Sequence, residues 1–423
     1  MVEYMFARLK SSLHALLRQS EAYTKTDMLY ATQGGFWLTL GKAIGLCFSL
    51  LFAVAMANLI PREIFGTYKF VLSGAAIVGS FSLLGMGSAI IQAVSRGFEG
   101  ALRQCVKEYF KWSFGVVGAS IAVAVYYFLN GNSVLAISFL IVGACNPIIT
   151  GFSFFSQFLS GKKDFKLFSI YDPLRNIVPA LILIGTVFFT SDPVLIVLVF
   201  FVSSALINIL LYYSTIQQYR PNDTNDPRTV SYGKHLSVIG VIGKIAGNID
   251  SILVFHYLGA AQLAIYAFAQ TPINNLKLLN DIPAKLALPK LTQRGLPELR
   301  ASLPRKVLLL VLLMFGVAAL YIAAAPFVFR ILFPQYMSSV VFSQVLALTL
   351  VLAPGSMFGE VLTAHMKKRE LYTSQITLPL ARIALLFILL PLFGIWGAIG
   401  ATFASQSLMF ILYAFQFWRA REE

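Results

Sequence analysis

Apolar residues occur along the chain in long blocks that short polar gaps separate. A helix needs about 20 mainly apolar residues to cross the hydrocarbon core of a bilayer. Twelve blocks meet this length, approximately over 31–60, 65–91, 108–129, 134–159, 166–189, 193–214, 235–258, 262–288, 306–332, 336–364, 372–392 and 395–418. A transmembrane barrel would instead show weaker alternating segments of about ten residues. The pattern therefore predicts an all-α polytopic membrane protein with twelve transmembrane helices.

Composition agrees with this pattern, because 58% of residues are hydrophobic and 12% are charged. The formal charge of +15 could suggest a nucleic-acid partner. However, 24 of the 33 Lys and Arg residues lie in the gaps on one side of the predicted membrane, against Arg62 and Arg330 on the other side. Such a bias marks the cytoplasmic side. It predicts a multi-pass protein with both termini in the cytoplasm and no nucleic-acid partner.

The gaps also divide the chain into segments. Residues 1–30 place apolar and basic side chains at helical spacing, which predicts a basic amphipathic segment on the cytoplasmic membrane face, with a frayed polar tail as the alternative. Residues 217–234 form the longest polar stretch near mid-chain and are expected to be a cytoplasmic linker. The linker separates an N-lobe of six spans (31–216) from a C-lobe of six spans (235–423).

A weak repeat relates the two lobes. The motif GKxxG occurs at Gly41–Gly45 in span one and again at Gly243–Gly247 in span seven. The aromatic pair Tyr68/Phe70 corresponds to Tyr266/Phe268 in the turn and span that follow. Both motifs cross the membrane in the same direction, so the repeat is parallel, with a pseudo-two-fold axis along the membrane normal. Substrate sites in such proteins lie between the two halves.

Seven cations lie inside the predicted spans. Lys69 and Lys111 are close to span ends, where a long side chain can reach the interface. The other five lie deeper in the spans: Lys42, Lys244, Arg175, Lys277 and Arg382. A charge at a helix centre costs about 2.5–3.5 kcal/mol. These five are therefore expected to face a water-filled cavity or to pair with acids.

Local pairing explains only some of these cations. Asp172 lies three residues before Arg175, and Asp281 lies four residues after Lys277, so each pair shares a helix face. Lys42 and Arg382 have no acid within one helical turn.

We therefore predict an anion site between the lobes that the five cations line. Phosphate or pyrophosphate would suit it, because Lys supplies a point charge and Arg can contact two oxygens. The alternative is that each cation only reaches the interface or bridges two helices.

The sequence lacks the motifs of metal sites and of phosphate-binding loops. Cys47, Cys105 and Cys145 have no metal-ligand spacing, and the four histidines are scattered without an HExxH motif. The stretch GVIGKIAG resembles a phosphate-binding loop, but Ile245 stands where that loop needs Ser or Thr. No enzymatic activity, metal or cofactor is expected.

At the level of whole segments, the sequence resembles the oligosaccharide-lipid flippases of the MOP superfamily, the Wzx-type polysaccharide transporters. The stretch from Leu40 to Arg96 resembles the family's opening, with Pro61 and Phe65-Gly66 after span one and Gly85-x-Gly87-Ser88 near the end of span two. The stretch GNIDSILVFHYLGAAQLAIYAFA, which contains Asp250, resembles the family's span seven. The resemblance covers nearly the whole chain.

The resemblance implies a MATE-like pair of six-helix lobes that alternates access to the two sides of the membrane. The implied substrate is an undecaprenyl-pyrophosphate-linked oligosaccharide, such as an O-antigen, capsule or exopolysaccharide repeat unit, moved to the outer leaflet of the bacterial inner membrane. The implied partners are membrane lipid and the polysaccharide polymerase machinery, and the expected state is a monomer. Asp250 is the first candidate for coupling to H⁺ or Na⁺, with Asp281 the second, because a membrane carboxylate can titrate between charged and neutral forms. Pairing of Asp250 with Lys244 or another buried cation is the alternative.

A second function on the same fold is an ion-coupled exporter of drugs or other small molecules. Cationic substrates need an acid-rich cavity, whereas the bases inside the spans outnumber the acids. This difference favours the flippase.

Overall fold

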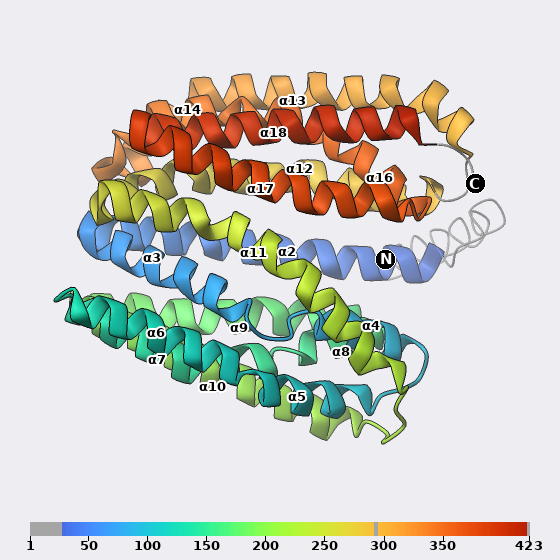
Figure 1. Ribbon diagram of the computed structural model, residues 1–423, viewed down its shortest axis with the longest axis horizontal. Coiled ribbons are helices and arrows are strands. Elements are labelled where there is room, and N and C mark those ends of the chain that lie inside the picture. The colour runs from blue at the N-terminus through green and yellow to red at the C-terminus, as the bar shows by residue number, and fades with distance from the viewer. Residues whose placement is uncertain (1–27, 292–294, 421–423) are drawn as a thin grey trace, which may run out of the picture.

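The computed structural model describes residues 28–291 and 295–420, in which every regular element is a helix (Figure 1). The predicted amphipathic segment 1–30 therefore lies almost wholly outside the described residues.

We call the end at which α2 and α11 terminate the outer end, and the opposite end the inner end, after the predicted orientation. In chain order the helices are α2 (Met28–Leu59), α3 (Arg62–Gly79), α4 (Met86–Ser95), α5 (Ala101–Trp112), α6 (Phe114–Leu129), α7 (Ser133–Phe152), α8 (Phe155–Gly161), α9 (Phe165–Val187), α10 (Pro193–Tyr219), α11 (Arg228–Leu258), α12 (Ala260–Leu291), α13 (Leu296–Leu332), η1 (Pro334–Tyr336), α14 (Ser339–Ala347), α15 (Thr349–Leu352), η2 (Ala353–Gly355), α16 (Ser356–Ala364), α17 (Lys368–Phe393) and α18 (Ile395–Arg419).

Each predicted span corresponds to one helix or to a run of consecutive helices. In the described ranges, ten helical segments are long and apolar enough to cross a membrane. The other two predicted spans correspond to α3 with α4 and to α12, which are helical but more polar. Arg62, Glu63 and Lys69 lie in α3, and α12 contains Gln270 and Lys277. The all-helical membrane fold is therefore confirmed, and the count of twelve crossings stays a prediction.

Three of the short gaps between the predicted spans correspond to tight turns between helices. Asn132 accepts a hydrogen bond from the backbone N–H of Leu135 at 3.0 Å and so caps α7. Asp192 caps α10 in the same way, with Pro193 in the first turn of the helix. Gly394 joins α17 to α18 at a φ of +57°, a conformation that side chains with a Cβ rarely adopt.

The linker between the lobes is shorter than predicted. Helix α10 continues to Tyr219 and α11 already begins at Arg228, so only residues 220–227 of the predicted 217–234 are non-helical. Polar residues extend both helices beyond their apolar parts, which explains why hydropathy alone overestimated the length of the linker.

In the described part of the chain, buried side chains form three clusters, and their arrangement shows how the lobes meet. One cluster joins both lobes and includes Met56 and Phe70 of the N-lobe with Val254 and Phe329 of the C-lobe. The other two clusters contain inner-end residues, one from the N-lobe around Phe158 and one from the C-lobe around Leu303. The lobes therefore share a single core toward the outer end and have separate cores toward the inner end.

Close contacts of α3 with the C-lobe hold the outer end together. A Cβ on Gly66 would lie 1.8 Å from the carbonyl oxygen of Ala260, so only glycine permits this approach of α3 to the start of α12. The rings of Phe70 and Phe255 stack at 4.1 Å between centroids, and those of Phe65 and Phe268 lie 4.6 Å apart. Two residues of the predicted aromatic repeat, Phe70 and Phe268, thus lie at the contact between the lobes.

Helix α11 crosses from one lobe to the other (Figure 1). At the inner end it packs against α4, where the Ser237 hydroxyl accepts a hydrogen bond from the Gly85 N–H at 2.9 Å. Lys234 also pairs with Glu108 of α5 at 2.6 Å. Helix α11 also packs against α17 of the C-lobe, where Asp250 in its outer half pairs with Arg382. The first half of α11 is therefore joined to the N-lobe, although it opens the predicted C-lobe.

We expect Gly66→Ala to destabilise the protein, because the added methyl group would collide with the Ala260 carbonyl oxygen. Overpacking of this kind costs about 1–3 kcal/mol. Thermal unfolding in detergent measures the effect. Gly118→Ala is the matched control, since Gly118 is also helical and has no atom within 4 Å of a Cβ. Equal melting temperatures for the two variants would contradict the proposed close contact.

Glu99 fixes the linker to the inner end of the N-lobe. Its carboxylate accepts hydrogen bonds from Lys162 at 2.6 Å and from the Asn222 N–H at 3.2 Å. The hydrogen bond from Lys162 lowers the pKa of Glu99 below its ordinary value, although partial burial acts in the opposite direction. The carboxylate therefore stabilises the folded protein at neutral pH, and this stabilisation is lost as the pH falls through the lowered pKa.

We predict that Glu99→Gln lowers the free energy of unfolding at pH 7 by about 1.5–3 kcal/mol, the usual contribution of a hydrogen bond to a charged group. The difference from the wild type should shrink below about pH 4, where carboxylates become protonated. Thermal unfolding measured from about pH 3 to pH 8, a range that includes the titration of carboxylates, checks this prediction. A difference that persists unchanged at the acidic end would show that the charge of Glu99 contributes nothing.

Candidate functional site

A cavity of about 550 Å³ lies at the inner half of the molecule, where the two lobes have separate cores. Its wall combines α4 and the segment before it with α11, α17 and α18, so both lobes contribute. The lining residues are Leu84, Gly85, Ser88, Leu236, Ser237, Ile239, Gly240, Gly243, Lys244, Ser374, Gln375, Leu378, Pro379 and Tyr413. Among these lining residues, Lys244 is the one charged side chain, and the described wall contains no carboxylate.

The surroundings of Lys244 leave its ammonium group available to a ligand. Its side chain is exposed, and no salt bridge joins it to another part of the chain that the structure describes. Gly240 and Gly243 lie on the same wall and have no atom within 4 Å of a Cβ. On the facing helix, Pro379 lacks an N–H, so the carbonyl of Gln375 loses its helical donor. The cavity thus offers one cation among neutral polar groups.

A buried ion pair lies beyond the end of this cavity. Asp250 of α11 is 3% exposed and pairs with the Arg382 guanidinium of α17 at 3.2 Å. Its carboxylate also accepts hydrogen bonds from the Tyr266 hydroxyl and the Gln270 amide of α12, each at 3.2 Å. Asp250 follows Lys244 by six residues on α11, about 9 Å along the helix axis. The carboxylate therefore joins three helices of the C-lobe.

Lys69 of α3 adds a second positive charge near this pair. It is half-buried and interacts electrostatically with Asp250. Its position near a span end predicted a side chain that reaches the interface, whereas in the structure it is half-buried and interacts with an acid of the opposite lobe. Lys69, Tyr266 and Gln270 were not predicted as site residues. The only sequence signal for them was their position in or beside the repeated aromatic pairs.

Two other candidate cations lie on packed helices of the N-lobe. Helix α2 packs against α9, where a Cβ on Gly41 would lie 2.9 Å from the carbonyl oxygen of Ser169. Lys42 is therefore close to α9 and has an exposed side chain. Arg175 of α9 pairs with Asp172 at 3.2 Å, which confirms the predicted local ion pair. It lines a separate pocket inside the N-lobe.

The remaining candidates lie on α12. Lys277 is half-buried. The side chain of Asp281 is outside the described part of the chain, so the predicted Lys277/Asp281 pair stays a prediction. The five candidate cations are thus distributed over α2 and α9, over α11 and α17, and over α12. Of these five, Lys244 is the one that lines the described cavity between the lobes.

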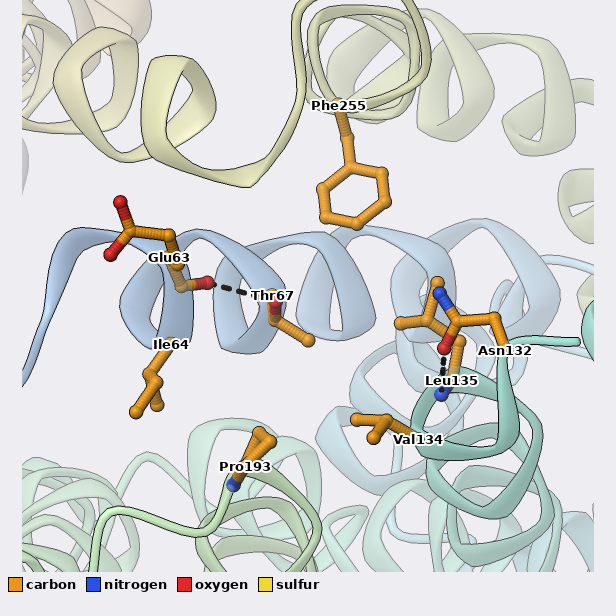
Figure 2. Close-up of a pocket in the computed structure, with 8 residues that line it drawn as sticks. All are labelled: Glu63, Ile64, Thr67, Asn132, Val134, Leu135, Pro193 and Phe255. Atoms are coloured by element: carbon orange, nitrogen blue, oxygen red, sulfur yellow. Dashed lines mark hydrogen bonds between the residues drawn. The ribbon is translucent and has the colours of Figure 1, made fainter.

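A third pocket, of about 300 Å³, lies toward the outer end between α3, α7, α10 and α11 (Figure 2). Phe255 reaches into it from α11, and Ile64, Val134 and Pro193 form much of its apolar wall. Among its described lining residues, Glu63 is the one that is charged. This pocket carries a negative charge where the inner cavity carries a positive one, so we do not consider it a site for an anion.

A family model described as "Polysaccharide biosynthesis protein" matches residues 31–293, more than half of the chain. The chain belongs to this family. No curated protein sequence gives a significant match.

Solved structures show the same fold at low sequence identity. The lipid II flippase MurJ in an inward closed conformation has a TM-score of 0.67 and 13% identity, and the match covers 90% of this chain and 87% of that one. An inward-facing multidrug resistance MATE family transporter of the MOP superfamily gives 0.63 and 13%, over 90% and 98% of the two chains. A MOP superfamily transporter from Pyrococcus furiosus, described as having a binding pocket of reverse polarity, gives 0.62 and 13%, over 93% and 96%. The chain therefore has the MOP-superfamily fold, as the sequence predicted.

We predict that neutralising either member of the Asp250–Arg382 pair alone destabilises the C-lobe. Removing one partner of a buried ion pair leaves an uncompensated charge, which costs about 3–5 kcal/mol. Asp250→Asn and Arg382→Gln should therefore each lower the melting temperature in detergent.

The double variant tests whether this loss comes from the pair. Because it leaves neither charge unpaired, its loss should be well below the sum of the two single losses. Additive losses would show that the two side chains do not act on each other.

Proposed function

We propose that the protein is a flippase that moves an undecaprenyl-pyrophosphate-linked oligosaccharide from the cytoplasmic to the outer leaflet of a bacterial cytoplasmic membrane. It would act as a monomer beside the polysaccharide polymerase machinery. The observation that carries this proposal is the cavity between the lobes, where Lys244 is the one charged residue of the described lining. The family match to polysaccharide biosynthesis proteins supports the substrate class.

The positive charge of the cavity favours an anionic substrate over a cationic drug. A pyrophosphate presents several acceptor oxygens, and the Lys244 ammonium can donate to them. A cationic substrate would meet this ammonium with no carboxylate in the described wall to offset it. The exporter, which shares the fold, is therefore the weaker candidate.

The arrangement of the buried clusters fits the first stage of an alternating-access cycle, in which the substrate site opens to the cytoplasm. The lobes share one core toward the outer end and have separate cores toward the inner end. With the predicted orientation, the protein is closed toward the outside and divided toward the cytoplasm, where the lipid-linked sugar is made. The pyrophosphate would enter beside Lys244, while the polyprenyl chain stays in the bilayer.

Coupling to an ion is a separate part of the proposal. Asp250 contacts Arg382 and lies near Lys69, so binding of Na⁺ there would place three cations around one carboxylate. A proton is the better-suited ion, since protonation of Asp250 would release Arg382 from its partner. Asp281 remains the second candidate carboxylate.

We predict that Lys244→Ala lowers the flipping rate of a fluorescent undecaprenyl-pyrophosphate-linked oligosaccharide in proteoliposomes by about tenfold, as expected for loss of one charge-assisted contact. Lys244→Arg should retain most of the activity, because it keeps the charge. Lys111→Ala is the matched control, since Lys111 is an exposed cation of α5 outside the cavity.

Two outcomes would contradict this proposal. Flipping by a folded Lys244→Ala variant at the wild-type rate would place the pyrophosphate elsewhere. Export of a cationic dye by the wild type, without flipping of the lipid, would favour the exporter.

A further inference from the structure

The N-lobe contains a polar pocket of about 350 Å³ that the inter-lobe cavity does not include. It lies between α3, α7, α9 and α10, and it shares no lining residue with the cavity at Lys244. A space of this volume is large enough for several water molecules. Helix packing alone does not account for a polar pocket of this size inside a membrane-embedded lobe.

Three asparagine side chains give the pocket its chemistry. The NH₂ group of each donates to a backbone carbonyl: Asn146 to Ala75 at 3.0 Å, Asn176 to Asp172 at 3.0 Å and Asn208 to Ser204 at 2.8 Å. A carbonyl oxygen can only accept, so these partners fix which end of each amide is the NH₂ group. The amide oxygens are therefore left as acceptors.

The oxygen of Asn208 is the most informative of the three. Asn208 is 3% exposed, and its Oδ1 is buried with no hydrogen-bond partner among the described residues. Buried polar atoms in folded proteins are nearly always paired. An acceptor without a donor, on a residue that lines a pocket, can be satisfied by a ligand that brings O–H or N–H groups or by a water molecule.

The other lining groups narrow the chemistry of this ligand. The Arg175 guanidinium contacts Asp172 through one nitrogen, so it keeps further N–H donors for a ligand. Phe200 and Phe201 add aromatic surface to the same wall. Amide acceptors, a guanidinium donor and aromatic rings together suit a sugar ring, which has hydroxyl groups at its edge and apolar C–H groups on its faces.

A metal cation and a lipid chain fit less well. A single cation would fill a small part of this volume and would lie near the Arg175 guanidinium. A hydrocarbon chain would leave the asparagine oxygens unpaired. We therefore propose that this pocket is a subsite for one sugar ring of the headgroup that the protein carries, a proposal that rests on the function proposed above.

The pocket is accessible from outside the helical bundle at α9. Asn176 is exposed, and the Arg175 side chain is 27% exposed. Helix α3, which forms one wall through Leu72, Ala75 and Ala76, also packs against α11 and α12. Helix α3 therefore separates the subsite from the contact between the lobes.

Binding to two lipids in nanodiscs tests the proposal. One is undecaprenyl pyrophosphate, and the other is the same lipid with one N-acetylhexosamine attached. The wild type should bind the sugar-bearing lipid more tightly. Asn208→Leu keeps the approximate size of the side chain and removes the acceptor. It should weaken binding of the sugar-bearing lipid by about five- to tenfold and leave binding of the sugar-free lipid unchanged.

Two further variants separate an effect on sugar binding from effects on the fold and on pyrophosphate binding. Asn130→Leu removes an asparagine with the same hydrogen bond to the residue four positions earlier, but outside the pocket, and should change neither affinity. Lys244→Ala should weaken binding of both lipids equally, because it acts on the pyrophosphate that they share.

The possible failures are distinguishable. Wild-type protein that binds neither lipid would contradict the flippase itself. Equal wild-type affinity for the two lipids would overturn the sugar subsite alone, as would equal effects of Asn208→Leu on both. Sodium binding that Asn208→Leu abolishes, with the sugar preference intact, would assign the pocket to an ion and also overturn the subsite.

Discussion

Helix α11 is attached to both lobes, and the positions of the other site residues depend on this. Its inner half is joined to the N-lobe by the Gly85–Ser237 hydrogen bond and the Glu108–Lys234 ion pair. Its outer half is joined to the C-lobe by the contacts of Asp250. Lys244 lies between these attachments, which explains why it faces the space that separates the two inner cores.

The two lysines of the GKxxG repeat show how similar motifs can have different surroundings. Lys42 lies on α2, which packs against α9 of its own lobe, whereas Lys244 lies on α11, which also packs against α3 and α4 of the other lobe. The repeat therefore does not determine the contacts of the two helices. A site of two symmetrical lysines does not follow from the repeat alone.

Much of the fold could be predicted from the sequence, because hydropathy and short turns report on single segments. The turns at Asn132, Asp192 and Gly394, the helical spans and the local Asp172–Arg175 pair all depend on residues that are close together in the chain. The Asp250–Arg382 pair joins residues 132 positions apart, so helical spacing could not reveal it. The same holds for Lys69, which interacts electrostatically with Asp250 of the opposite lobe. The polar pocket at Asn208 was also missed, since asparagines in apolar helices give no charge signal.

The charge of the inner cavity has a consequence for the energy source of transport. If a pyrophosphate binds beside Lys244, the loaded cavity is net negative, and the empty cavity is net positive. A membrane potential that is negative inside contributes about 2.3 kcal/mol per charge and per 100 mV. It would favour outward movement of the loaded site and inward return of the empty one. Voltage would then act in the useful direction on both halves of the cycle, in addition to the proton proposed to bind Asp250.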